Sequence, residues 1–334
     1  MIRLLPNSNS TAPSDRCQAG PKRARRRFLS TLALTGLVAM LGCGGGDSGG
    51  GSSSGEASKT GSTPAKATGQ TLRFTAIPDH NTTELRAKYD PVAAHLSSVL
   101  GFPVEYVPSA DYGASVEMFK NGDVQLAWFG GLTGVQARQA VPGARAIVQG
   151  KEDPEYYSYF IANASTGLAP SDDFPMDIAK YKFTFGSQSS TSGRLMPEYY
   201  IRQHSGKSPT EFFTHEFGFS GSHDKTVEQV ANGTYEVGAC NYGTYDKMVA
   251  DGKVDPAVCK IIWKTPTYAD YNFTARPDID ETFGPGTIDK IQKACTAIHD
   301  PKLLAAFQRS ALIPATNAEF DNILAVAREL GMAR

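Results

Sequence analysis

The chain has 334 residues, with 33 Lys and Arg against 34 Asp and Glu, which allows one large or two ordinary domains around a sizeable core. The balance is uneven, because residues 1–42 carry seven of the basic side chains and one acid. The remaining 26 basic and 33 acidic residues argue against nucleic-acid binding, which needs a basic face.

The N-terminal segment predicts export. A basic cluster ending at Arg27 precedes a largely apolar run, 28–41, that is too short to span a bilayer and is typical of a signal peptide, so we expect the signal peptide at 1–42. Gly42 and Cys43 resemble the bacterial lipobox, in which the cysteine is lipidated, although Met40 and Leu41 depart from its commonest form. A plain secretory signal cut elsewhere is the alternative. The Arg25–Arg26–Arg27 run also resembles the twin-arginine export motif.

The segment after Cys43 is rich in Gly, Ser, Thr and Ala and has almost no large apolar residue. Such a composition buries too little surface to fold, so we expect 43–69 to be a lipidated cysteine followed by a flexible tether. The protein would then be a periplasmic or cell-envelope lipoprotein, held at the membrane through Cys43.

Strands and helices alternate from Leu72 onward. The predicted strands have short apolar runs, and the predicted helix after Asp90–Pro91 has a helical apolar stripe, with Asp90 as N-cap and Pro91 as first residue. In the first series we expect strands at 72–77, 104–107, 124–129, 146–148 and 156–160, and helices near 92–100, 116–119 and 133–140.

A second series follows, and the last 60 residues read as helices with few strand signals. We expect strands at 182–185, 235–239 and 260–263 and helices at 193–203, 225–231, 242–250, 288–298, 302–312 and 318–330. Two such series predict an α/β fold of two lobes, each a mixed, mostly parallel sheet flanked by helices. Open α/β sheets bind ligands at the carboxyl ends of their strands, so the ligand should lie between the lobes.

One stretch at such a strand end is typical of an anion site. In FGSQSSTSGRLMP (Phe185 to Pro197), a small-residue turn leads from a strand into a helix. The first N–H groups of a helix lack intrahelical partners, and Ser190, Thr191 and Ser192 add hydroxyl donors. An ordinary Ser/Thr N-cap is the alternative. The nearby Arg194 could reach an anion, although exposed arginines are mostly solvated.

Four stretches in order resemble one family: AWFGG (127–131), FGSQSSTSGRLMP (185–197), SGSHDKTVEQVANG (220–233) and WKTPTYADYNF (263–273). Together they resemble the phosphate, phosphite and phosphonate-binding proteins of ABC importers, and most closely a subgroup named for selenate binding. The resemblance covers Leu72 to about Pro314. It implies a type II periplasmic binding protein with one lobe from 70–165 plus 275–334 and another from 166–274.

The resemblance also implies a function and its binding residues. The protein would capture a small tetrahedral oxyanion and deliver it to permease and ATPase subunits, as a monomer and without a cofactor. The family's Ser-Thr-Ser falls on Ser190, Thr191 and Ser192, its cleft tyrosine on Tyr112 and its histidine on His223.

Three further positions depart from the family pattern. Its second tyrosine is Phe129 here, which removes one phenolic donor, so another group replaces it or the ligand is held by fewer bonds. The acid that receives the amine of aminoalkylphosphonates matches Asp270 only with a one-residue gap, and Tyr268 or Tyr271 could line that part instead. An amine-bearing ligand is therefore in doubt.

The residues also have plainer interpretations. Tyr112 could be an ordinary amphipathic tyrosine, His223 a loop residue paired with Asp224 or capping a helix, and Phe129 a core side chain. If His223 contacts the anion, its ordinary pKa near 6.5 predicts tighter binding below about pH 7 than above about pH 8.

Other classes of function fit less well. The G-x-S-x-G motif of a hydrolase is absent around Ser190, and His223 and Asp224 are too close in sequence for one triad, so we expect no enzyme. The six histidines lack metal-site spacing, although His215 and His223 could meet in space. A sensor subunit that reports ligand to a membrane kinase uses the same lobe closure and stays open. Three cysteines remain in the folded part, and Cys240 with Cys259 is the pair that could form a disulfide, free thiols being the alternative.

Overall fold

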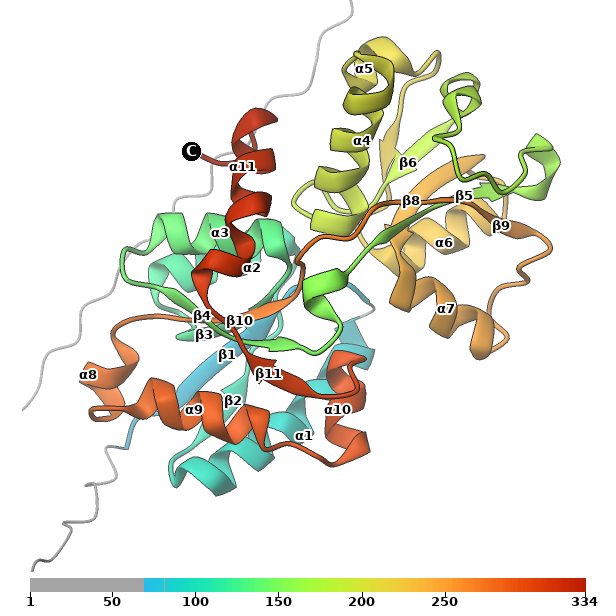
Figure 1. Cartoon of the computed structure of the whole chain (residues 1–334). Coiled ribbons are helices and arrows are strands. Elements are labelled where there is room, and N and C mark those ends of the chain that lie inside the picture. The colour runs from blue at the N-terminus through green and yellow to red at the C-terminus, as the bar shows by residue number, and fades with distance from the viewer. Residues whose placement is uncertain (1–68, 81) are drawn as a thin grey trace, which may run out of the picture. The chain divides into compact units, whose positions relative to one another are not determined.

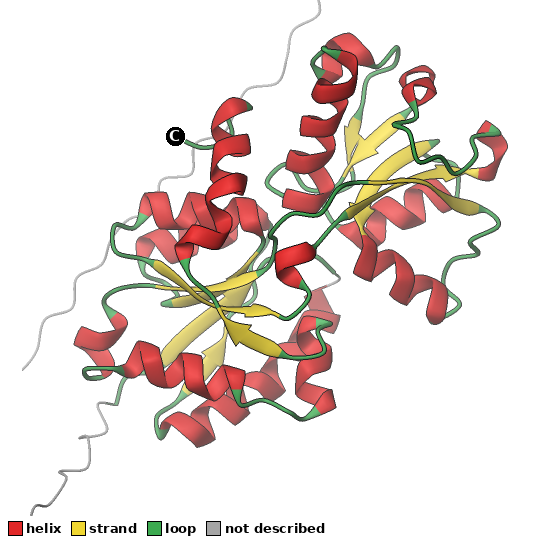
Figure 2. Ribbon diagram, viewed as in Figure 1, coloured by secondary structure: helices red, strands yellow, loops and turns green. Residues whose placement is uncertain are grey.

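The structure, a computed structural model, describes residues 69–80 and 82–334 (Figure 1). The expected signal peptide, Cys43 and the tether lie outside these residues, apart from Gly69. The described residues belong to one compact unit with two β-sheets (Figure 2). None of its helices is both long and apolar enough to cross a membrane, over the stretch that the structure describes.

The strands are β1 (Leu72–Ala76), β2 (Val104–Tyr106), β3 (Leu126–Phe129), β4 (Arg145–Gly150), β5 (Ser158–Asn163), β6 (Phe183–Phe185), β7 (Gly218–Phe219), β8 (Val237–Asn241), β9 (Cys259–Lys264), β10 (Asn272–Ala275) and β11 (Leu312–Pro314). The α-helices are α1 (Thr82–Leu100), α2 (Tyr112–Asn121), α3 (Gly131–Ala140), α4 (Met196–Ser205), α5 (Pro209–Phe212), α6 (His223–Ala231), α7 (Tyr242–Ala250), α8 (Ile279–Phe283), α9 (Thr287–Thr296), α10 (Pro301–Phe307) and α11 (Asp321–Glu329). A π-helical turn, η4 (Thr191–Leu195), leads into α4, and 3₁₀ turns occupy Asp153–Glu155, Ala164–Thr166, Met176–Lys180 and Asn317–Phe320.

The two sheets confirm the two-lobed α/β fold. The first sheet has the order β11-β4-β10-β3-β1-β2, and the second has the order β7-β6-β8-β5-β9. Both are more mixed than the sequence indicates: β1 is parallel to β2 and β3, and β6 to β7 and β8, whereas β10, β11 and β5 pair antiparallel with their neighbours. The antiparallel pairs arise where the chain passes from one sheet to the other or returns at the end.

The two passages between the sheets lie side by side. Tyr156 and Tyr268 exchange both backbone hydrogen bonds, at 2.9 and 2.8 Å, and the N–H of Asp270 donates to the carbonyl of Asp153 at 3.1 Å. The sequence places the lobe boundaries at 165/166 and 274/275, whereas β5 already pairs in the second sheet and β10 in the first. By sheet membership the passages therefore lie before Ser158 and between Lys264 and Asn272.

The core follows the alternation of side chains along the strands. On β5, Phe160 packs into an aromatic cluster on one face of the second sheet, and Ile161 packs with Val227 and Cys240 on the other. The first lobe has its own cluster, which includes Phe74, Trp128 and Phe273. Each sheet is therefore covered by its own hydrophobic clusters, and these fix the strands from whose ends the loops begin.

Two expected elements differ in the structure. Helix α1 begins at Thr82 rather than after Asp90, because Leu85, Tyr89, Val92 and Leu96 form one continuous buried stripe. Pro91 lies inside this helix on its exposed side, where the carbonyl that loses its N–H partner can meet water.

The expected helix 302–312 ends early. Gln308 has a φ of 54°, in the left-handed region, and terminates α10. Leu312 is then buried in β11, where it pairs with Gly150 of β4. Of the two alternatives for Cys240 and Cys259, the structure has the free thiols rather than the disulfide, and both are buried, as is Cys295.

Candidate ligand-binding site

The Ser-Thr-Ser segment forms a tight turn at the carboxyl end of β6. The Ser190 hydroxyl accepts the N–H of Gly193 at 2.9 Å and so caps the π-helical turn η4. The helical turn begins at Thr191 rather than at the expected Gly193, which leaves the N–H groups of Thr191 and Ser192 in the first turn. All three residues of the segment are buried. The turn is thus a compact group of donors at a helix start.

Hydrogen bonds from other segments of the second lobe hold the backbone of this turn. The Ser158 hydroxyl on β5 donates to the carbonyl of Ser192 at 2.7 Å, and Gly186 donates its N–H to the carbonyl of Gly193 at 2.8 Å. A Cβ on Gly193 would stand 3.1 Å from the Cα of Gly186 and 3.1 Å from Cε1 of His223. A side chain at position 193 would therefore fit only if the turn and the imidazole moved apart by a few tenths of an ångström.

His223 is the first residue of α6 and faces the turn. Its Nδ1 accepts the backbone N–H of Asn241 at 3.2 Å, and its Nε2 lies 3.4 Å from the Ser190 hydroxyl. Burial lowers the pKa of His223 to about 4. The positive end of the α6 dipole also disfavours a cation at this position. The imidazole is therefore neutral at pH 7, with Nδ1 as acceptor and the proton on Nε2, toward the turn.

Tyr112 of the first lobe and Asp270 of the second passage between the lobes bring unpartnered polar atoms to the turn. Tyr112 begins α2 and is 1% exposed, and its hydroxyl, which lies beside Ser190, has no hydrogen bond of good geometry within the described chain. Asp270 is also 1% exposed. One of its oxygens accepts the N–H of Gly131 at 2.9 Å, whereas Oδ2 lacks a partner among the residues that the structure describes.

The carboxyl of Asp270 is poised to titrate near neutral pH. Burial raises its pKa to about 7, although the Gly131 N–H and the Thr191 hydroxyl act in the opposite direction. Thr191 also accepts the N–H of Leu132, at the start of α3, at 3.0 Å. Thr191 of the second lobe therefore meets Asp270 and the helix start of α3 directly.

The structure thus brings together six of the predicted residues: Ser190, Thr191, Ser192, Tyr112, His223 and Asp270. Phe129 is different, since its ring is fully buried and packs edge-to-face on Phe119, with centroids 5.5 Å apart. It lies next to Gly130 at the start of α3, where the donors are backbone N–H groups. Where the family has a tyrosine hydroxyl, this chain therefore has Phe129 and, next to it, the backbone N–H groups at the start of α3.

Tyr271 has another role. Its hydroxyl donates to Asp79 at 3.2 Å and accepts the side-chain N–H of Asn241 at 3.0 Å, so it is already engaged. Arg194 is engaged in part, because its guanidinium lies 4.3 Å from the centre of the Phe185 ring and its Nη2 forms an ion pair with Glu198, whereas its buried Nη1 has no partner among the described residues. The donors assembled around the Ser190–Ser192 segment are therefore mainly hydroxyls, N–H groups and an imidazole, and the Arg194 charge is balanced by Glu198.

Sequence reasoning missed Asp79 and Asn241. Asp79 follows β1 and Asn241 is the last residue of β8, so both lie at the carboxyl ends of strands in parallel pairs, and this rule could have indicated them. It also missed the buried ion pair between Arg309 and Asp153, at 2.6 Å. In this pair Arg309 stacks on Tyr156 and Tyr271, which belong to the two passages between the lobes.

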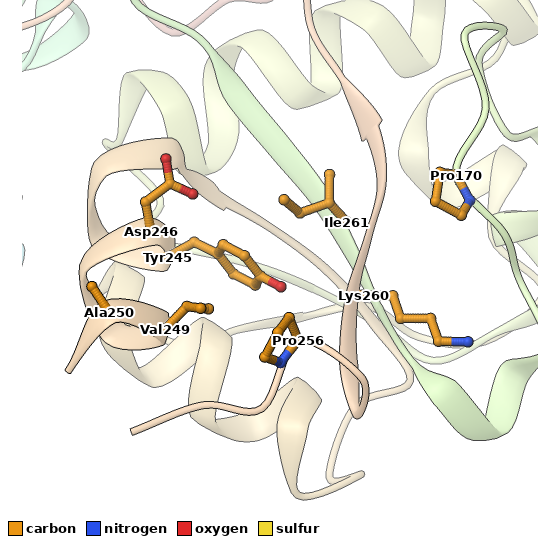
Figure 3. Close-up of a pocket in the computed structure, with 8 residues that line it drawn as sticks. All are labelled: Pro170, Tyr245, Asp246, Val249, Ala250, Pro256, Lys260 and Ile261. Carbon is orange, nitrogen blue, oxygen red and sulfur yellow. The ribbon is translucent and has the colours of Figure 1, made fainter. Parts of the chain in front are cut away.

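Two other features bear on the choice of site. Over the described ranges, no group of three or more His, Cys, Asp or Glu side chains could hold a metal ion. A wide depression of about 630 Å³ lies in the second lobe (Figure 3), where the charged ends of Asp246 and Lys260 lie on opposite sides of mainly apolar side chains and do not converge. It is lined by Pro170, Tyr245, Asp246, Val249, Ala250, Pro256, Lys260 and Ile261, none of which is a predicted site residue.

Comparison with known proteins identifies the family. The sequence model of the phosphonate-binding family, described as the periplasmic substrate-binding protein of a phosphonate ABC transporter, matches residues 74–320. The chain belongs to this family. It is 32% identical over 280 residues to a probable ABC transporter phosphite-binding protein of Prochlorococcus marinus, covering 82% of this chain and 94% of the relative.

Two further comparisons agree. The phosphate-import protein of Mycolicibacterium smegmatis is 30% identical over 283 residues, covering 81% of each chain. The structure of PhnD1 from Prochlorococcus marinus in complex with methylphosphonate has a TM-score of 0.75 and 33% identity, and the match covers 79% of this chain and 99% of that chain. The chain is therefore a substrate-binding protein of the phosphonate ABC transporter family, and not an enzyme.

Proposed function

We propose that this protein captures a small phosphonate, phosphite or phosphate between its two lobes and delivers it to the permease and ATPase subunits of an importer. The observation that carries the proposal is the pair of unpartnered buried atoms, Tyr112 Oη and Asp270 Oδ2, next to the Ser190–Ser192 turn. Buried polar atoms are normally hydrogen-bonded, so a ligand that supplies both an acceptor and a donor accounts for them.

The donors suit the oxygens of a tetrahedral anion. The first N–H groups of η4, the hydroxyls of Ser190 and Ser192, the Tyr112 hydroxyl and Nε2–H of His223 come from three separate segments, whereas the Thr191 hydroxyl already contacts Asp270 and the N–H of Leu132. Several converging donors of this kind bind an anion without a full positive charge. The relatives add support, since one is named for phosphite, one for phosphate import, and one structure holds methylphosphonate.

Asp270 favours a ligand that carries a proton. An ionised carboxylate repels a fully ionised oxyanion, but it accepts a hydrogen bond from a protonated oxygen. Phosphoryl groups lose their second proton near pH ~6, so they can share one proton with Asp270 near neutral pH. Sulfate and selenate lack this proton near neutral pH, which argues against the selenate ligand that the sequence resemblance allows.

The pH dependence follows from the shared proton. We expect methylphosphonate to bind less tightly above pH 8, by up to about tenfold per pH unit, because one proton must then be taken up. The sign agrees with the expectation from the sequence, but the responsible group is Asp270 with its ligand, since His223 is already neutral. Calorimetry from pH 6 to pH 9 measures this slope.

The direct test is a ligand panel on the purified protein. Methylphosphonate, phosphite and phosphate should raise the thermal midpoint at pH 7, and sulfate and selenate should do so weakly. An asparagine at position 270 offers an N–H donor, so Asp270→Asn should lose phosphonate affinity and gain on sulfate. Equal binding of sulfate and methylphosphonate by the wild type would contradict the role of Asp270, and no shift with any oxyanion would contradict the function itself.

We also propose that the protein is exported and anchored through a lipid on Cys43. The support is the sequence pattern before Cys43 and the periplasmic description of the family. Labelling with a fatty-acid analogue should mark the wild type and not Cys43→Ala. A Cys43→Ala protein that stays in the membrane fraction and carries label would contradict this.

A further inference from the structure

Asn241 has three hydrogen-bonded contacts that point in three directions. As the N-cap of α7, its Oδ1 accepts the N–H of Thr244 at 2.7 Å. Its backbone N–H donates to Nδ1 of His223 at 3.2 Å, and its side-chain Nδ2 donates to the hydroxyl of Tyr271 at 3.0 Å. The residue is 2% exposed, so little water competes for these bonds.

The bond to Tyr271 continues into the first lobe. The Tyr271 hydroxyl donates to the carboxylate of Asp79, which follows β1, at 3.2 Å. The Tyr271 ring is held between Trp128, with centroids 6.0 Å apart, and Arg309, at 4.9 Å from its centre. A bridge of Asn241, Tyr271 and Asp79 thus joins the end of β8 in the second lobe to the end of β1 in the first.

The bridge is enclosed. A cavity of about 10 Å³ borders Asn241, Tyr271, Asp79 and Arg309, which is room for about one water molecule. Hydrogen bonds shielded in this way are stronger than exposed ones, and leaving one end unpaired is costly. Any separation of the lobes at this point would break the bond between Asn241 and Tyr271 or that between Tyr271 and Asp79.

We propose that Asn241 is a positioning residue that couples contact between the lobes to the orientation of His223 in the binding site. Its side chain senses the first lobe through Tyr271, and its backbone N–H fixes which nitrogen of His223 carries the proton. The inference rests on the proposed function only in that the imidazole then faces a bound oxyanion. Through this link, ligand capture and lobe contact favour each other.

The experiment uses two conservative variants. Asn241→Asp keeps the N-cap acceptor but loses the N–H donor, and Tyr271→Phe loses only the hydroxyl. Each should weaken methylphosphonate binding about fivefold, the value of one hydrogen bond. In the double variant the loss should be much smaller than the product of the two single losses, because both remove the same bond.

Two matched changes serve as controls. Asn163→Asp alters another N-cap asparagine, whose side-chain N–H donates to the carbonyls of Val230 and Ala231 within the second lobe. Tyr106→Phe removes the hydroxyl of another buried tyrosine, which has no partner among the described residues. Both should change stability without changing methylphosphonate affinity.

Nuclear magnetic resonance of the imidazole nitrogens separates positioning from general destabilisation. In the ligand-free wild type, His223 should be the tautomer with its proton on Nε2, and the two test variants, unlike the controls, should shift its nitrogen signals. Unchanged His223 signals in Tyr271→Phe, or fully additive affinity losses, would overturn the proposal. If the wild type binds none of methylphosphonate, phosphite or phosphate, the proposed function fails, and the His223 signals still decide the link.

Discussion

Replacing Asp270 with asparagine should stabilise the ligand-free protein above neutral pH, although it damages the site. Burial raises the pKa of Asp270 from its ordinary 3.8 to about 7. Between these values the unfolded chain has lost the proton that the folded protein still holds. The folded state then binds more protons than the unfolded state, so its stability falls as pH rises through this range.

The magnitude follows from the two pKa values. Each pH unit between them costs about 1.36 kcal/mol, so the full loss above pH 7 is about 4 kcal/mol, on the order of a third or more of a typical protein's stability. An amide at position 270 does not ionise and can still accept the N–H of Gly131. The variant's advantage should therefore widen by about 2.7 kcal/mol from pH 5 to pH 7 and then level off.

Urea unfolding of both ligand-free proteins at pH 5, 6, 7 and 8 measures this difference. The change Asp123→Asn, at an exposed position, controls for the loss of one acidic group. Stability curves of wild type and Asp270→Asn that run parallel across this range would refute the reasoning, because they would show that the carboxyl ionises normally in the folded protein.

Three further changes test the site and its surroundings. Because the pKa of His223 lies near 4, the free energy of unfolding of the wild type should fall as the pH drops from about 6.5 toward 4. In urea unfolding, His223→Gln should reduce this fall by about 1.36 kcal/mol per pH unit. An unchanged slope in the variant would contradict the low pKa of His223. Gly193→Ala should cost about 1 to 3 kcal/mol by overpacking against Ser190 and His223 and should weaken binding, as calorimetry can show; a variant with wild-type stability and affinity would contradict this. The charged groups of Glu84 in the first lobe and Lys253 in the second lie 3.7 Å apart, and both side chains are half exposed. Glu84→Lys should therefore weaken methylphosphonate binding only about twofold at low salt, and adding Lys253→Glu should restore it. A loss of affinity that persists at high salt would point to another cause.

The sequence was most informative where local pattern and chemistry agree. The Ser190–Ser192 turn combines a strand end, small residues and a helix start, and the structure has all three. Helix α7 has the predicted bounds, 242–250, because Asn241 is a strong N-cap. The sequence could not predict that β5 pairs with β8 in the second sheet and β10 with β3 in the first. These pairings depend on contacts between residues more than 70 positions apart.

The roles of individual site residues required geometry. Tyr271 and Asp270 are neighbours in sequence, and the family pattern could not decide between them. The structure separates them, because the Tyr271 hydroxyl is paired with Asp79 and Asn241, whereas Oδ2 of Asp270 is unpartnered in the described chain. The charge of His223 was likewise hidden, since it depends on burial and on a backbone N–H from Asn241.

The site's chemistry suggests selection by proton count rather than by charge alone. The hydroxyl, N–H and imidazole donors around the Ser190–Ser192 turn are neutral, the carboxyl of Asp270 lies beside the turn, and Asp79 lies at the end of the Asn241–Tyr271–Asp79 bridge. A cationic site would gain affinity from every anion and lose it steeply with salt. Neutral donors together with one carboxyl instead give higher affinity for an oxyanion that retains a proton. Methylphosphonate affinity should therefore change little between low and physiological salt while falling with rising pH, and a steep salt dependence at constant pH would point to an arginine or lysine in contact with the ligand.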